Sequence, residues 1–245
     1  MSKVLVIGDS CTDIFIYGDI LRISPEAPVP VIIPKNQTEN KGMAGNVFEN
    51  LCSLGVEADI VTNTNSIKKI RYVDEKSNQM VLRVDKHDHC LRITNILSIN
   101  FNQYDSVIIS DYCKGFLKEE DIEQISNVVE CPTFLDTKKY LGDLCNKINY
   151  IKINSLEHHK NFERLPNYPQ LKEKLIVTKG SQGCLYKDKI YPTQEVSIKD
   201  VSGAGDTFIA GLAVEYVKSK NIEKAINFAQ KCTTKVVQKT GVATV

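Results

Sequence analysis

The sequence predicts an α/β fold, a mostly parallel sheet with helices on both faces and a small projecting β flap. Short apolar runs typical of buried strands alternate with segments of helical periodicity. Several of these runs end in a polar residue, namely Asp111, Asp136, Asn154 and Thr178. Ligands of open α/β sheets bind beyond the carboxyl ends of the strands. We therefore expect these polar residues to surround a cleft.

The chain length is compatible with one α/β domain, or with a domain plus a small appendage, and its charge is balanced. Of its 245 residues 42% are hydrophobic, and 31 Lys and Arg balance 30 Asp and Glu. This balance argues against nucleic acid or an anionic membrane surface as a partner. The chain has no apolar run of membrane-spanning length, and its N-terminus turns polar too quickly for a signal peptide. The 8 scattered cysteines indicate reduced thiols, so we expect a cytoplasmic protein.

The N-terminal third predicts one buried strand followed by the flap. Lys3–Ile7 is apolar and ends at a glycine turn. The β-like runs over 15–21 and 29–33 flank a segment too rich in proline for a helix or a central strand. We expect the flap at about residues 14–34, and the polar hairpin pattern over 67–85 is a possible second part of it.

The remaining elements alternate between helices and strands within a single domain, residues 1–245. Apolar spacing predicts helices over the ranges 42–54, 118–129, 204–217 and 222–237. Buried-strand patterns occupy the ranges 106–110, 133–135, 150–153 and 175–177. Each of these strands directly precedes one of the polar residues named above. This order is typical of a parallel sheet covered on both faces.

The sequence Gly203-Ala204-Gly205-Asp206 stands directly before an apolar helical run. Glycines let the backbone approach a ligand closely. A helix that begins there directs its free N–H groups and positive dipole end toward an anion. A carboxylate beside a bound phosphoryl group suits removal of a proton from an attacking hydroxyl. The motif predicts a phosphotransferase that acts on an alcohol, although a helix N-cap with an acidic first turn gives a similar pattern.

Several motifs resemble those of ribokinase-like (pfkB-type) carbohydrate kinases. Gly203–Asp206 resembles their C-terminal signature, and Gly42-Met43-Ala44-Gly45-Asn46 resembles their N-terminal Gly-Gly-x-x-x-Asn element. The stretch Ser24–Pro30 looks like the opening of bacterial D-glycero-β-D-manno-heptose 7-phosphate kinases. Further matches to that branch follow in order at 110–115, 136–138, 154–157 and 241–245. The resemblance covers nearly the whole chain.

The resemblance implies a role for each residue of the glycine motif. Asp206 is similar to the family's general base, which accepts the proton of the attacking sugar hydroxyl. The backbone N–H groups of Gly203, Ala204 and Gly205 would stabilise charge on the transferring phosphoryl group. Phosphoryl transfer depends mainly on positioning and charge stabilisation, so these groups provide the core of the chemistry.

The resemblance also implies contacts to the sugar phosphate. Asp13, Gly42 and Asn46 would contact sugar hydroxyls, although a polar residue such as Asn46 is also common at a helix start. Arg71 and Arg83 on the polar hairpin are candidates for binding the 7-phosphate. A solvated surface is the alternative for both arginines.

The resemblance of two further motifs implies which residues bind the nucleotide. Asn154 and Glu157 form an Asn-x-x-Glu element that resembles the family's site for ATP phosphates and Mg²⁺, with Glu157 as the metal residue. An ordinary capping pair would have the same spacing. Thr178, Lys179 and Gly180 resemble the strand end that binds the nucleotide. Lys138 is a candidate contact to a phosphate.

The sequence departs from the family in three places. Met43 replaces the second glycine of the Gly-Gly pair, which could narrow the sugar pocket. After Asp59-Ile60-Val61 a helix-plus-strand unit of about 30 residues is missing. The chain ends at Val245 without the family's terminal helix or the cytidylyltransferase domain of bifunctional relatives. A homodimer built on the flap, as the resemblance implies, would cover part of the weakened sheet edge.

We therefore expect an ATP-dependent, Mg²⁺-assisted kinase that phosphorylates the C1 hydroxyl of D-glycero-β-D-manno-heptose 7-phosphate. Its product, the 1,7-bisphosphate, would feed ADP-heptose and lipopolysaccharide core synthesis. One alternative is a kinase of the same type for another sugar or sugar phosphate. The other is a catalytically degenerate protein that binds nucleotide or sugar.

Overall fold

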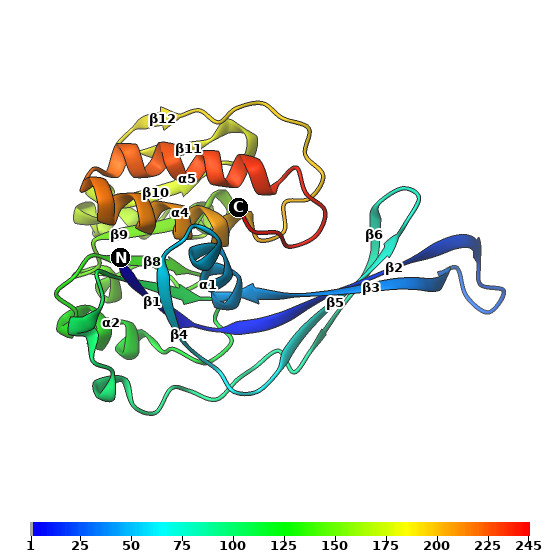
Figure 1. The fold of residues 1–245 in the computed structure, drawn as a ribbon, viewed down its shortest axis with the longest axis horizontal. Coiled ribbons are helices and arrows are strands. Elements are labelled where there is room, and N and C mark those ends of the chain that lie inside the picture. The colour runs from blue at the N-terminus through cyan, green and yellow to red at the C-terminus, as the bar shows by residue number, and fades with distance from the viewer. Residues whose placement is uncertain (1) are drawn as a thin grey trace.

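A computed structural model describes residues 2–245, and its central feature is a twisted sheet of eight strands (Figure 1). The strand order is β12-β11-β10-β9-β8-β7-β1-β4. In chain order the strands are β1 (Lys3–Gly8), β4 (Glu57–Thr62), β7 (Ser106–Asp111), β8 (Thr133–Thr137), β9 (Tyr150–Asn154), β10 (Leu175–Thr178), β11 (Cys184–Tyr186) and β12 (Lys189–Tyr191). The strands from β4 to β10 pair in parallel, and β11 and β12 pair antiparallel. The predicted α/β class is confirmed.

Helices cover both faces of this sheet. They are α1 (Ala44–Ser53), α2 (Glu119–Val128), α3 (Ser155–Asn161), α4 (Ala204–Ser219) and α5 (Ile222–Val236). Helices α1, α4 and α5 contribute to one core together with Val4 and Val6 of β1. Helix α2 contributes to the other core together with Leu5 and Ile7. Successive side chains of a strand point to opposite faces, so β1 is buried on both sides and reads as a continuous apolar run.

Short 3₁₀ helices connect many of the regular elements. They are η1 (Ile96–Ser98), η2 (Phe101–Gln103), η3 (Asp143–Cys145), η4 (Leu165–Asn167), η5 (Pro169–Glu173) and η6 (Gly180–Gln182). No helix within residues 2–245 is long and apolar enough to span a membrane.

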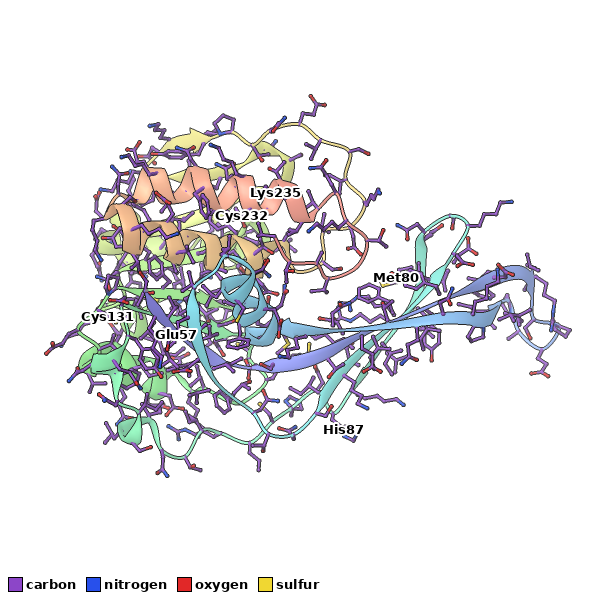
Figure 2. All side chains as sticks on the ribbon, viewed as in Figure 1. Glu57, Met80, His87, Cys131, Cys232 and Lys235 are labelled. Atoms are coloured by element: carbon purple, nitrogen blue, oxygen red, sulfur yellow. The ribbon has the colours of Figure 1, made fainter. Side chains whose placement is uncertain are left out.

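A second, four-stranded sheet forms the flap, which projects from the body of the molecule (Figure 1). Its order is β3-β2-β5-β6, with β2 (Ser10–Ile23), β3 (Pro30–Met43), β5 (Ile67–Asp74) and β6 (Gln79–Lys86). Strand β2 begins and strand β3 ends at the body, where Ser10 pairs with Met43, so the flap is longer than the range 14–34. Met80, labelled in Figure 2, lies on β6 in the hairpin that β6 forms with β5.

The chain passes directly from the main sheet into the flap at strand β4. This strand is the edge of the main sheet, and only residues 63–66 separate it from β5. Most β4 side chains are half-buried rather than fully buried. The position after Val61, where we expect a helix-plus-strand unit to be missing, therefore lies at an edge of the main sheet.

Candidate functional site

The polar residues at the strand ends lie along one edge of the parallel sheet, where helix α4 begins. Neighbouring strands place Asp136 beside Lys152 and Asn154 beside Thr178. A cavity of about 120 Å³ there is lined in part by Thr178, Gly180, Ala204 and Gly205. The structure thus brings the strand ends and the glycine motif together. Lys179 is not among the residues that line this cavity.

Asp206 is the centre of the site. It lies in the first turn of α4 and is 3% exposed. Its carboxylate accepts hydrogen bonds from the Tyr112 hydroxyl at 2.6 Å and from Asn46 Nδ2 at 3.0 Å. Burial raises the pKa of Asp206 to about 6, while these two hydrogen bonds act in the opposite direction. Asp206 is therefore a carboxylate at neutral pH, with a pKa suited to accepting a proton.

Tyr112 is a site residue whose role the sequence analysis did not assign, although it stands in the matched stretch 110–115. Burial and the charge of Asp206 raise its pKa well above the ordinary value, so its hydroxyl remains a donor. The buried Asp9 carboxylate holds the loop that carries Tyr112. It accepts from the backbone N–H groups of Tyr112 at 2.7 Å and Phe116 at 3.1 Å. Asp9 is therefore a positioning residue for Tyr112.

Substituting Tyr112 by phenylalanine is expected to raise the pKa of Asp206. The hydroxyl bond favours the charged carboxylate, so its loss favours the protonated form. Because Asp206 must be ionised to accept a proton, activity should appear at higher pH, with the acidic limb of kcat/KM moved up by about one unit. A pH profile of kcat/KM measures this. Tyr104→Phe, which removes a hydroxyl bonded to Asp59 away from the site, is the control. An unshifted limb for Tyr112→Phe would contradict the assignment.

The start of α4 offers open backbone donors. The N–H of Thr207 donates to Gly203 and that of Ala204 donates to Val201. Among residues 2–245 no acceptor lies within hydrogen-bond distance of the N–H groups of Gly205 and Asp206. Gly203 has φ 77°, and a Cβ there would overlap the amide of Asn46. The glycine is therefore required for the contact between Asn46 and Asp206.

Lys152 is a second site residue that the sequence analysis missed. It lies on β9, is 3% exposed, and forms an ion pair of 2.7 Å with Asp136. A lysine in an otherwise apolar strand pattern, two residues before Asn154, was the available signal. Its partner could be identified only from the pairing of β8 with β9.

Asn154 and Glu157 form a capping box at the start of α3. Asn154 Oδ1 accepts from the Glu157 N–H at 2.9 Å, and Glu157 Oε2 accepts from the Asn154 N–H at 2.8 Å. Glu157 also forms an ion pair with Lys138. Lys138 lies over the Tyr112 ring, 5.1 Å from its centroid, so this group adjoins Asp206. The pair therefore has the capping geometry and also faces the site.

The residues expected to contact sugar phosphate lie where the flap joins the body. The buried Asp13 forms an ion pair with Arg71, and a Cβ on Gly42 would overlap the Asp13 carboxylate. Arg83 faces Arg71 across β5 and β6 and donates to Asp85 from Nε and Nη2, each at 2.7 Å. Each arginine therefore has a carboxylate partner in the chain.

Met43 is buried and has φ 60°, a conformation that is strained for a residue with a side chain. Its Sδ accepts a hydrogen bond from the buried Lys69 ammonium at 3.0 Å. Lys69 also lies over the Tyr112 ring, 5.2 Å from its centroid. The Met43 side chain thus occupies space beside the site that a glycine would leave open.

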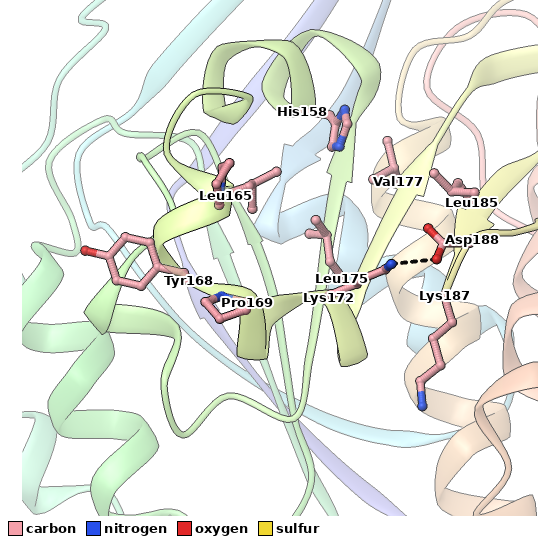
Figure 3. Close-up of a pocket in the computed structure, with 11 residues that line it drawn as sticks. His158, Leu165, Tyr168, Pro169, Lys172, Leu175, Val177, Leu185, Lys187 and Asp188 are labelled. Carbon is pink, nitrogen blue, oxygen red and sulfur yellow. Dashed lines mark ion pairs between the residues drawn. The ribbon is translucent and has the colours of Figure 1, made fainter.

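A larger cavity lies elsewhere, over β10 and β11. Figure 3 shows it with His158 at its rim and Leu175, Val177 and Leu185 in its wall. Its volume is about 360 Å³. The residues that line it do not include Asp206 or any residue of the glycine motif. It is therefore separate from the candidate active site.

Comparisons with known proteins agree with the observed fold. The family model described as pfkB family carbohydrate kinase matches residues 46–245. The chain is 31% identical to Bifunctional protein HldE of Nitratiruptor sp. and 32% identical to that of Aliarcobacter butzleri, over 99% of this chain. It spans 63% and 62% of the length of those relatives. A ribokinase structure from Thermotoga maritima is similar with a TM-score of 0.74 at 17% identity, covering 99% of this chain and 95% of that one.

Proposed function

Because the chain belongs to the pfkB family of carbohydrate kinases and is an ATP-dependent sugar kinase, we propose that its substrate is D-glycero-β-D-manno-heptose 7-phosphate. The enzyme would phosphorylate the C1 hydroxyl, in the cytoplasm, and supply the 1,7-bisphosphate for ADP-heptose and lipopolysaccharide core synthesis. The resemblance of Ser24–Pro30 to the heptose kinases supports this choice of sugar. The buried Asp206 beside the open N–H groups of α4 supports the chemistry.

The proposed reaction is a single displacement at the γ-phosphorus of ATP. Asp206 accepts the proton of the C1 hydroxyl, and the oxygen forms a bond to the γ-phosphorus. The bond between that phosphorus and the oxygen shared with the β-phosphorus breaks, and ADP leaves with the electron pair. Open N–H groups at the start of α4, including that of Gly205, stabilise the charge on the phosphoryl oxygens. Asn46 and Tyr112 hold the Asp206 carboxylate in place.

Magnesium fits this site through the ATP phosphates rather than through a cage of side chains. Residues 2–245 contain no cluster of three or more His, Cys, Asp or Glu side chains placed to hold a metal ion. The Glu157 oxygens already accept hydrogen bonds from Asn154 and Lys138, so we assign Glu157 to hold the ion mainly through water. When bound, the ion would neutralise charge on the phosphates. Thr178, Lys179 and Gly180 remain our proposed nucleotide contacts.

Arg71 and Arg83 remain our proposed ligands for the 7-phosphate, together with Lys138 as a further phosphate contact. Guanidinium groups bind phosphate through paired hydrogen bonds. Binding would require the substrate to compete with Asp13 for Arg71 and with Asp85 for Arg83. Asp13, Gly42 and Asn46 would contact the sugar ring.

We also propose a homodimer formed through the flap. Its apolar side chains are unusually exposed, with Leu21 at 78%, Ile23 at 61%, Ile33 at 56% and Leu82 at 54%. Exposed apolar surface of this kind marks an interaction site, and an uncovered β edge favours pairing with another chain. Sedimentation velocity should show a dimer. A monomer at every concentration would exclude this interface.

The buried Met43 supports the alternative of a different sugar, because its side chain packs in a cluster with Tyr112, the partner of Asp206. An acceptor panel separates the candidates. We expect kcat/KM for the heptose 7-phosphate to exceed that for the unphosphorylated heptose by about 10²-fold or more, since the phosphate contributes charge-assisted hydrogen bonds. A higher kcat/KM with ribose or fructose 6-phosphate would show that the substrate is a different sugar. ATP binding without turnover on any acceptor would instead favour the degenerate binding protein.

A further inference from the structure

We propose that Lys152 is a further catalytic residue, whose ammonium group binds the phosphoryl group during its transfer from ATP. The inference rests on the kinase chemistry proposed above and does not depend on which sugar is the acceptor. It is carried by the position of Lys152 against the start of α4, by its unused hydrogen-bonding capacity, and by the glycine opposite it.

Lys152 lies in the middle of β9, two residues before its last residue Asn154, and points toward helix α4. Its Nζ lies 2.7 Å from Asp136 Oδ2, and the two side chains are 4% and 1% exposed. The same Nζ lies 2.6 Å from the position that a Cβ on Gly205 would occupy. The ammonium group and the first turn of α4 therefore face each other across a space that exists because residue 205 has no side chain.

This arrangement places two positive features together. The first turn of a helix carries a partial positive charge, and the N–H groups of Gly205 and Asp206 have no acceptor among residues 2–245. The Asp136 carboxylate balances the charge of the Lys152 ammonium, whereas the N–H groups beside it are left without an acceptor. Open N–H donors beside an ammonium group with unused donors form a site that an anionic ligand would complete.

Lys152 and Asp136 leave some of their hydrogen-bonding capacity unused, as expected of a site that binds an anionic ligand. An ammonium group has three donors, and Asp136 is the partner of Lys152 within residues 2–245. The other oxygen of Asp136, Oδ1, is buried without a partner. Lys138 is likewise paired with Glu157, and Lys139 with Asp111, but neither has an atom within 4 Å of the Cβ position of Gly205. Lys152 is thus the lysine beside Gly205 that retains free donors.

The transferring phosphoryl group is the anion that fits. It must pass between Asp206, which receives the proton of the acceptor, and the open N–H groups of α4. Negative charge on its outer oxygens must be stabilised as the bond to ADP breaks. Lys152 would donate to those oxygens, while the ion pair with Asp136 holds the ammonium group in position. Asp136 is a positioning residue in this account.

The first test separates catalysis from a structural ion pair. Lys152→Met alone leaves Asp136 as a buried unpaired charge and is expected to destabilise the fold. The double variant Lys152→Met with Asp136→Asn removes both charges. We expect it to recover most of the lost thermal stability but to keep a kcat reduced by about 10²-fold. Recovery of wild-type kcat in the double variant would overturn the proposal.

The second test does not depend on turnover. Binding of ADP is compared with binding of a non-hydrolysable ATP analogue that carries a γ-phosphoryl group, by calorimetry with magnesium present. In the double variant we expect the analogue to bind about tenfold more weakly, with the affinity for ADP changed by less than about threefold. Equal changes for both ligands would overturn the proposal, whereas failure of the heptose assay alone would leave this result unaffected.

Lys174→Met is the matched control. Its ammonium donates to the backbone carbonyls of Cys145, Asn146 and Ile148, at the opposite end of β10 from Thr178. Its loss should lower thermal stability, but kcat and the ratio of the two nucleotide affinities should stay at wild-type values. A loss of kcat in Lys174→Met as large as in the Lys152 variants would show that destabilisation alone explains the effect.

Discussion

Asp206→Asn is expected to lower kcat by about 10³-fold or more while leaving ATP affinity nearly unchanged. The asparagine keeps the size of the side chain and can still form hydrogen bonds with Tyr112 and Asn46. It cannot accept a proton from the sugar hydroxyl. Single-turnover rates and ATP titrations on wild type and variant measure the effect. Activity within about tenfold of wild type would exclude Asp206 as the general base.

The same substitution is expected to increase stability near neutral pH. Burial raises the pKa of Asp206 from 3.8 to about 6, so ionisation is harder in the folded state than in the unfolded chain. The folded state therefore binds more protons between these values, and the contribution of Asp206 to stability is lost as pH rises through this window. Removing the buried charge should raise the free energy of unfolding by about 1–3 kcal/mol at pH 7.5.

The stability gain of Asp206→Asn should shrink as pH falls from about 6 to 3.8 and be absent at lower pH, where the wild-type carboxyl is protonated in both states. Melting curves at several pH values measure this. A variant that is inactive and also less stable at pH 7.5 would show that the substitution disrupts the fold, and its lost activity would then say nothing about proton transfer.

Gly203→Ala is expected to lower kcat by about 10²-fold. Residue 203 has φ 77°, so an alanine there has an unfavourable backbone conformation. Its Cβ would also overlap the Asn46 amide, and Asn46 would lose its hydrogen bond to Asp206. Both the direction of the carboxylate and its pKa would then change, with the acidic limb of the pH profile moving upward.

Gly55→Ala provides the matched control for Gly203→Ala. Residue 55 has φ 74°, and a Cβ there would have no neighbour within 4 Å. The control therefore has a similar backbone cost, about 1–2 kcal/mol, without a change near Asp206. Equal losses of stability with a loss of activity only in Gly203→Ala would support the account. Full activity of a folded Gly203→Ala would contradict the role of Asn46.

The fold could be predicted because its signals are local. Apolar runs that end in Asp111, Asp136, Asn154 and Thr178 identify parallel strands, and the glycine motif identifies the start of α4. Strands β11 and β12 were missed because three-residue strands carry almost no periodicity. The flap strands were underestimated because their ends, toward Ser10 and Met43, are polar or irregular in sequence.

Site residues could be predicted where a sequence motif identifies them, but not where strand pairing brings them together. Asp206 and Asn46 stand in recognisable motifs. Lys152 becomes a site residue only because β9 pairs with β8 and places it beside Asp136. From the sequence, Arg71 is a candidate phosphate ligand without a partner in the chain. In the structure β5 pairs with β2, and Arg71 forms an ion pair with Asp13. Contacts between residues far apart in the chain produce no recognisable residue spacing in a single sequence.

The most direct test of the central claim is ³¹P NMR of the purified protein with Mg-ATP and D-glycero-D-manno-heptose 7-phosphate. The account predicts that the γ-phosphate signal of ATP declines as ADP forms, and that a new phosphate monoester appears with coupling to the anomeric proton. Asp206→Asn should give neither change. A monoester coupled to a different sugar proton, or ADP formed together with free phosphate alone, would contradict transfer to the C1 hydroxyl.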